Sequence, residues 1–99
     1  MLDKLTVTSF SQYINQKFLV HIEGNDPLEL TLIEATEVGA AQDPRYRQAF
    51  SVVFVGPAQP ILPQRIYRVE HEEMGALDLF LVSLGPNRDG NTRYETVFA

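Results

Sequence analysis

Two histidines, one of them in an acidic run, are the side chains best suited to acid–base or metal chemistry in this chain. His71 lies between Glu70 and the pair Glu72 and Glu73, and His21 lies in a separate apolar segment. Because side chains alternate across a strand, His71 shares a face with Glu73, whereas Glu70 and Glu72 point away. A metal site would need His21 or another carboxylate from across the sheet. The plainer interpretation is a polar strand end that leans towards solvent, so we predict no metal site.

The side chains that could act as nucleophiles lack the partners that nucleophilic catalysis requires. The chain has no cysteine, and Ser51 and Ser83 both lie inside apolar, strand-like segments. Neither serine stands in a G-x-S-x-G turn or beside a base in the sequence. The carboxylates that could pair at a cleft are expected to be solvent-exposed instead. They are Glu29, Glu34, Glu37, Glu70, Glu72 and Glu95. We therefore assign no catalytic residue.

The segment from Asn87 to Asn91 has oxygen-bearing side chains at alternate positions, as calcium loops do. In a complete calcium loop a glycine stands sixth and a glutamate twelfth. Here Gly90 comes too early, and no glutamate follows at the required distance. The Asp89-Gly90 pair is instead typical of a hairpin turn. The remaining glycines are isolated turn residues that form no phosphate loop, so we expect no cofactor.

A proline-rich segment from Gly56 to Pro63 is the most informative candidate for binding. It presents Ile61 and Leu62 between prolines. A stiff, exposed apolar loop loses little entropy when it docks on a partner. The alternative is that both side chains fold back onto the core. The candidate binding residues are in this segment and in the strands predicted at 64–72 and 92–98: Ile61, Leu62, Gln64, Tyr67, His71 and Tyr94.

The N-terminal segment has the pattern of a short amphipathic helix. Ser9 and Gln12 fit a capping box, in which each side chain accepts a backbone hydrogen bond at the helix start. Phe10, Tyr13 and Ile14 follow the spacing of one helical face. A helix this short is not stable alone. We therefore expect its aromatic face to close one end of a β core.

Period-two alternation of apolar and polar residues predicts six strands. They span residues 17–23, 28–38, 47–55, 64–72, 77–84 and 92–98, with a polar connection at 39–46 and a tight turn at Met74-Gly75. Ile33 interrupts the alternation, which predicts a β-bulge or bend. The segment 50–55 is apolar on both faces, as in a central strand, and so is the fifth strand beyond Asp78. The pattern predicts an all-β fold: a single six-stranded antiparallel barrel or sandwich with a short N-terminal helix.

Composition bounds the size of the fold and its partners. A chain of 99 residues, 44% hydrophobic and 21% charged, fits one globular domain over residues 1–99. Its net charge of −5 and lack of a basic stripe disfavour nucleic acid and anionic membranes. The first residues have neither a basic region nor an apolar core, and no apolar run approaches the roughly 20 residues of a membrane span. We expect a cytoplasmic protein or one exported without a Sec-type signal.

The sequence also resembles a family of short bacterial proteins described as a domain of unknown function. The resemblance covers nearly the whole chain. Its most specific parts are the Pro-Gln-x-x-Tyr stretch at residues 63–67, the Glu70-His71 pair and the closing Tyr-Glu-x-x-Phe stretch at residues 94–98. It implies an all-β domain and supplies no catalytic residues.

Three functional interpretations remain open at this point. The first is a non-catalytic interaction or structural module of a larger assembly, which binds a protein partner or a second copy through a sheet edge or the proline-rich segment. The second is a barrel that holds a small ligand at its mouth, near Tyr67, His71 and Tyr94. The third is an enzyme that uses His71 with nearby carboxylates. The absence of a convergent polar cluster in the sequence favours the first.

Overall fold

The structure, a computed structural model, describes residues 5–38 and 48–98. Within these ranges its elements are α1 (Val7–Ser11), β1 (Lys17–His21), β2 (Leu28–Glu37), β3 (Phe50–Gly56), β4 (Arg65–His71), β5 (Gly75–Pro86) and β6 (Thr92–Phe98). Neighbouring strands are antiparallel in the order β1-β2-β3-β6-β5-β4, and the sheet closes into a barrel. The predicted all-β fold is confirmed, and the choice between barrel and sandwich is decided for the barrel.

Alternating side chains fill the interior of this barrel. On β4, Tyr67 and Val69 are buried, while Arg68 and Glu70 are exposed on the outer face. The largest fully buried side chains include Tyr94, Phe10, Phe18, Phe50, Phe54, Leu30, Leu32, Leu79 and Leu81. Small barrels are filled by side chains in this way. As predicted for a central strand, β3 is buried on both faces over most of its length.

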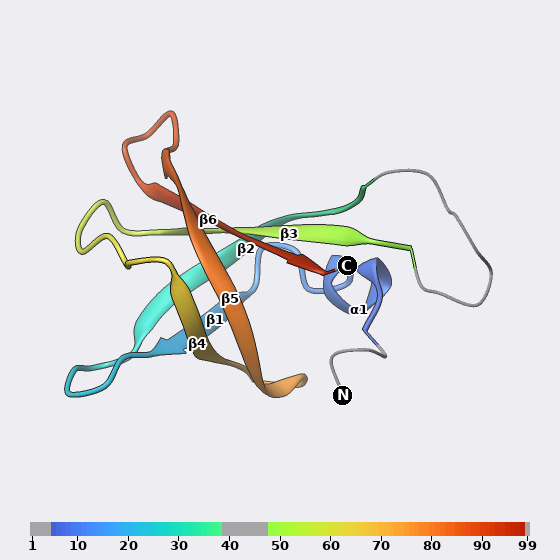
Figure 1. Cartoon of the computed structure of the whole chain (residues 1–99), viewed down its shortest axis with the longest axis horizontal. Helices are drawn as coiled ribbons and strands as arrows, with labels where there is room; N and C mark the ends of the chain where they lie inside the picture. The colour runs from blue at the N-terminus through green and yellow to red at the C-terminus, as the bar shows by residue number, and fades with distance from the viewer. Residues whose placement is uncertain (1–4, 39–47, 99) are drawn as a thin grey trace.

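Helix α1 closes one end of the barrel, as predicted. Phe10 is fully buried, and its ring centroid lies 6.5 Å from that of Phe18, 6.0 Å from Phe50 and 5.4 Å from Phe98. Figure 1 shows α1 beside the C-terminus, with the β3–β4 and β5–β6 connections at the far end of the molecule.

The predicted capping box at Ser9 and Gln12 is wrong by three positions. The helix is capped by Thr6, whose backbone N–H donates a hydrogen bond to the Ser9 hydroxyl oxygen over 3.0 Å. Both pairs have the spacing of a capping box. Starting the helix at Thr6 places Phe10 inside it, where its ring points into the core.

Irregular pairing occurs at two positions in the sheet. The β2–β3 register shifts between Leu32 and Glu34, which confirms the bulge predicted at Ile33. A second shift between Ser83 and Gly85 bends β5, which continues to Pro86 instead of ending at residue 84. The polar connection expected at 39–46 and the expected start of the third strand at residue 47 lie outside the described residues.

Candidate functional site on the outer face of β1, β4 and β5

Two of the predicted binding residues, Tyr67 and Tyr94, fasten the proline-rich loop to the barrel. The Tyr94 hydroxyl oxygen accepts a hydrogen bond from the Leu62 backbone N–H over 2.9 Å. The Tyr67 hydroxyl donates to the Pro63 carbonyl over 2.6 Å. Burial raises the pKa of Tyr67, and the charge of nearby Arg65 partly offsets this rise. Both phenols therefore serve the fold of the loop.

The two neighbouring apolar residues of the loop, Ile61 and Leu62, differ in their exposure to solvent. Leu62 is 5% exposed and belongs to the core, whereas Ile61 is 55% exposed. Gln64 is also exposed, just before β4. The two alternatives for this loop thus each hold for one residue: Leu62 folds back onto the core, and Ile61 faces solvent.

The prediction that His71 leans towards solvent is wrong. His71 is only 6% exposed, and its ring packs 4.5 Å from the Phe18 ring and 4.4 Å from the Tyr13 ring between centroids. Its Nδ1 accepts hydrogen bonds from the backbone N–H groups of Glu73 and Met74, over 3.1 and 3.2 Å. An acceptor nitrogen carries no proton, so the ring proton lies on Nε2.

The remaining nitrogen of His71 is also engaged, because Nε2 lies 2.7 Å from Gln16 Oε1 and donates to it. The adjacent Tyr13 hydroxyl donates a hydrogen bond to the Glu73 carboxylate, and this hydrogen bond raises the pKa of Tyr13. His71 therefore caps the β4–β5 turn and ties it to the segment after α1. It lies four residues along β4 from Tyr67, about 13 Å at strand spacing, so these two predicted residues do not lie side by side.

Within the described residues, no group of three or more His, Asp or Glu side chains is arranged to hold a metal ion. The same part of the chain contains no helix long and apolar enough to cross a membrane.

Two exposed apolar side chains lie side by side on the outer wall formed by β4 and β5. Ile66 on β4 pairs directly with Phe80 on β5. Ile66 is 66% exposed and Phe80 is 47% exposed. The next row of this wall is charged, because Arg68 pairs with Asp78. An apolar pair thus stands on the outer surface beside a charged row.

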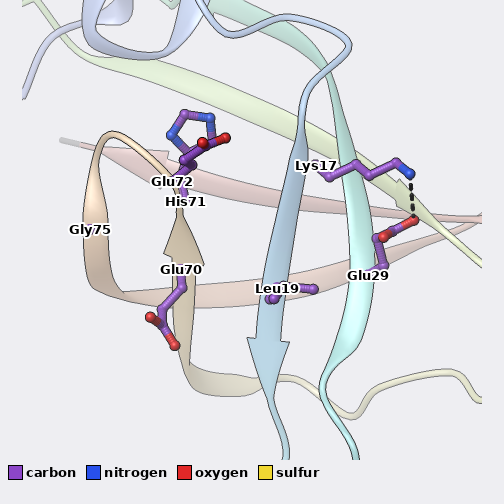
Figure 2. Close-up of a pocket in the computed structure, with 7 residues that line it drawn as sticks. All are labelled: Lys17, Leu19, Glu29, Glu70, His71, Glu72 and Gly75. Atoms are coloured by element: carbon purple, nitrogen blue, oxygen red, sulfur yellow. Dashed lines mark ion pairs between the residues drawn. The ribbon is translucent and has the colours of Figure 1, made fainter.

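A groove extends this outer face over β1. Its volume is about 470 Å³, and it is lined by Lys17, Leu19, Glu29, Glu70, His71, Glu72 and Gly75. Figure 2 shows Leu19 on β1 between Glu70 on β4 and Glu29 on β2. Lys17 Nζ lies 3.6 Å from Glu29 Oε1, and Nε2 of His21 contacts Glu70 Oε1. The groove is thus rich in carboxylates, with the exposed Leu19 side chain on its floor.

A comparison with protein-family models matches residues 5–98 to a family described as a domain of unknown function (DUF6916). The chain belongs to this family. The resemblance predicted from the sequence is confirmed at that level. Comparisons with curated proteins and with solved structures returned no significant match. The family description states no activity.

Neither Ile66 nor Phe80 was among the predicted binding residues, although the sequence contains a signal for them. The fifth strand is apolar on both faces beyond Asp78. In a single-walled barrel one face of each strand points away from the core. Phe80 shares its face with the charged Asp78, so the alternation places Phe80 on the outside. Ile66 shares the exposed face of Arg68 through the alternation along β4, and its direct pairing with Phe80 depends on the register, which the sequence does not specify.

Proposed function

We propose that this domain is a non-catalytic protein-interaction module that binds its partner through the outer face of β4 and β5. The observation that carries the proposal is the directly paired Ile66 and Phe80, with exposures of 66% and 47%. Fully burying a side chain of this size contributes about 1.5–3 kcal/mol. Two such side chains in register give a partner a compact apolar contact.

The surroundings of the pair have the composition of a binding surface. Arg68 on β4 and Asp78 on β5 are exposed in the adjacent row. Binding surfaces combine an apolar centre with a polar rim, and aromatic residues and arginine are enriched in them. This arrangement supports protein binding over solvation of an ordinary outer strand face.

The polar atoms of His71, Tyr67 and Tyr94 bond within the chain, which supports a non-catalytic role for these predicted residues. Both ring nitrogens of His71 are engaged within the chain, and the hydroxyl groups of Tyr67 and Tyr94 bond to the proline-rich loop. A general base needs a nitrogen or oxygen within reach of substrate. These groups do not offer one.

The fully buried aromatic side chains argue against the alternative of a small ligand that enters the barrel at its mouth, near Tyr67, His71 and Tyr94. Phe10 closes the helix end, and Phe18, Phe54 and Tyr94 occupy the interior. Side chains in such interiors are close-packed, and an internal ligand would have to displace them. The outer face requires no such rearrangement.

Site-specific photo-crosslinking in the source cells tests the proposal. A photoreactive phenylalanine derivative replaces Ile66 in one variant and Val97 on β6 in a second. Val97 is the matched control, because it is apolar and 59% exposed but lies on another strand. We expect a discrete adduct from position 66 that is absent from position 97 and is lost when Phe80→Glu is added. Equal labelling from both positions, or no adduct from either, contradicts the proposal.

A further inference from the structure

The outer face of β4 carries its charges in a fixed order along the strand. Ile66, Arg68 and Glu70 are exposed, while the residues between them are buried. Glu72 is exposed just after the end of β4. The first half of this face is therefore basic and apolar, and the second half is acidic.

We propose that the partner is a second copy of this chain, packed face to face with β4 running antiparallel to β4, so that Arg68 of each copy lies against Glu70 of the other. This inference rests on the proposed function, because it names the partner of the same surface. A two-fold axis makes an interface self-complementary: if residue i contacts residue j, then j contacts i. A face with opposite charges on either side of its midpoint meets that requirement.

The charge order selects the antiparallel arrangement. When the two-fold axis runs perpendicular to the strands and crosses β4 at Val69, Arg68 of each copy approaches Glu70 of the other. With the axis along the strand, Arg68 would approach Arg68 and Glu70 would approach Glu70. Like charges placed opposite one another in an interface are strongly unfavourable. Opposed sheets pack about 10 Å apart, a gap that arginine and glutamate side chains span together.

The neighbouring strands are compatible with the same axis. Arg68 stands in a row with His21 on β1 and Asp78 on β5. Glu70 stands in a row with Leu19 and Ala76. The axis places the first row of one copy over the second row of the other. Asp78 then faces the small side chain of Ala76, and His21 faces Leu19, so neither contact opposes like charges.

The next row contributes the apolar part of the contact. The same axis places Phe80 of one copy over Met74 of the other, which is partly buried against its own core, and places Ile66 over the exposed Glu72. Thioether sulfur atoms make favourable contacts with aromatic rings. The exposed Phe80 ring thereby gains an apolar neighbour that the single copy does not provide.

Sedimentation velocity of the full chain and of two charge-reversal variants tests this dimer. We expect the native chain to dimerise reversibly, with a dissociation constant that rises with salt. Arg68→Glu leaves two acidic side chains at the centre of the face, and Glu70→Arg leaves two basic ones. Each variant alone should dimerise at least tenfold more weakly, since like charges then meet across the axis.

Mixing the two variants supplies the decisive result. The acidic centre of one and the basic centre of the other are complementary, so an equimolar mixture should recover a dimer that neither variant forms alone. Arg88→Glu in the β5–β6 turn is the control, because it makes the same charge change at an exposed site away from the face. Thermal unfolding followed by circular dichroism shows that each variant is folded.

Three results overturn the inference: a native chain that stays monomeric at its highest soluble concentration, a dimer unaffected by either reversal, or a mixture that stays monomeric. An adduct from position 66 to a different protein also overturns it but leaves the proposed function standing. The proposed function fails separately, when position 66 gives no adduct beyond that of position 97.

Discussion

The Tyr94 hydroxyl and the Leu62 backbone N–H form a buried hydrogen bond of 2.9 Å between residues 32 positions apart in the chain. The bond joins the last strand to the proline-rich loop. It also explains how a loop with an exposed Ile61 stays anchored, because its neighbour Leu62 is held against the core.

Tyr94→Phe should destabilise the domain more than Tyr67→Phe. Removing the Tyr94 hydroxyl leaves the buried Leu62 N–H without a partner, which costs about 1–3 kcal/mol. Removing the Tyr67 hydroxyl leaves the Pro63 carbonyl without its donor, but Pro63 is exposed and water can replace the bond. We therefore expect a loss of about 1 kcal/mol or less in the free energy of unfolding. Urea unfolding of both variants measures the difference. Equal losses, or a larger loss for Tyr67→Phe, would show that the Leu62 bond is not the anchor.

Phe10→Ala should unfold the domain far more readily than Ile14→Ala. Phe10 is fully buried among three aromatic rings, and truncating such a side chain costs about 3–5 kcal/mol. Ile14 only packs at the margin of the core, so its truncation should cost clearly less. Equilibrium denaturation compares the two free energies of unfolding. A small effect at Phe10 would mean that α1 does not close the barrel.

His71 should be found as the tautomer with its proton on Nε2. Nδ1 accepts two backbone N–H groups of the β4–β5 turn, and Nε2 donates to Gln16. Long-range ¹H–¹⁵N correlation spectra at neutral pH distinguish the two ring nitrogens by their chemical shifts. Detection of the proton on Nδ1 would be incompatible with the hydrogen bonds of this turn.

Stability should fall at alkaline pH through Tyr13 and Tyr67. The bond to Glu73 raises the pKa of Tyr13, and burial raises that of Tyr67, in each case above the ordinary 10.0. Below pH 10.0 Tyr13 and Tyr67 keep their protons in both the folded and the unfolded chain, and the stabilisation by these hydroxyl groups is complete. As the pH rises above 10.0, the two tyrosines lose their protons in the unfolded chain first. Their contribution to the free energy of unfolding therefore declines until the pH has passed the raised pKa values of the folded chain.

The double variant Tyr13→Phe, Tyr67→Phe is the control for this pH dependence. Urea unfolding across the alkaline range should give a shallower decline for the variant than for the native chain. An unchanged slope would assign the alkaline loss of stability to other groups.

Local patterns were sufficient to predict the strands, because the alternation of side chains across a strand depends only on neighbouring residues. The bulge at Ile33 was predicted for the same reason: one extra residue disturbs a period of two. The helix start was missed by three residues because Thr6 and Ser9 fit the capping spacing as well as Ser9 and Gln12 do.

The candidate site depended on contacts between distant segments, which the sequence does not specify. His71 was expected to face solvent, yet it is covered by Phe18 and Tyr13 and bonded to Gln16, which lies 55 residues away. The apolar pair of Ile66 and Phe80 exists only because β4 and β5 pair in one register. In another register Ile66 would stand opposite a different residue of β5.

The central claim is that the outer face of β4 and β5 binds a protein, and the most direct measurement is the affinity of the protein crosslinked from position 66. Isothermal titration of that protein compares the native chain with Phe80→Glu and Val97→Glu, which introduce the same charge at exposed apolar sites on different strands. The predicted result is at least a tenfold loss of affinity for Phe80→Glu, about 1.4 kcal/mol, and little change for Val97→Glu. Native affinity in Phe80→Glu would contradict the claim.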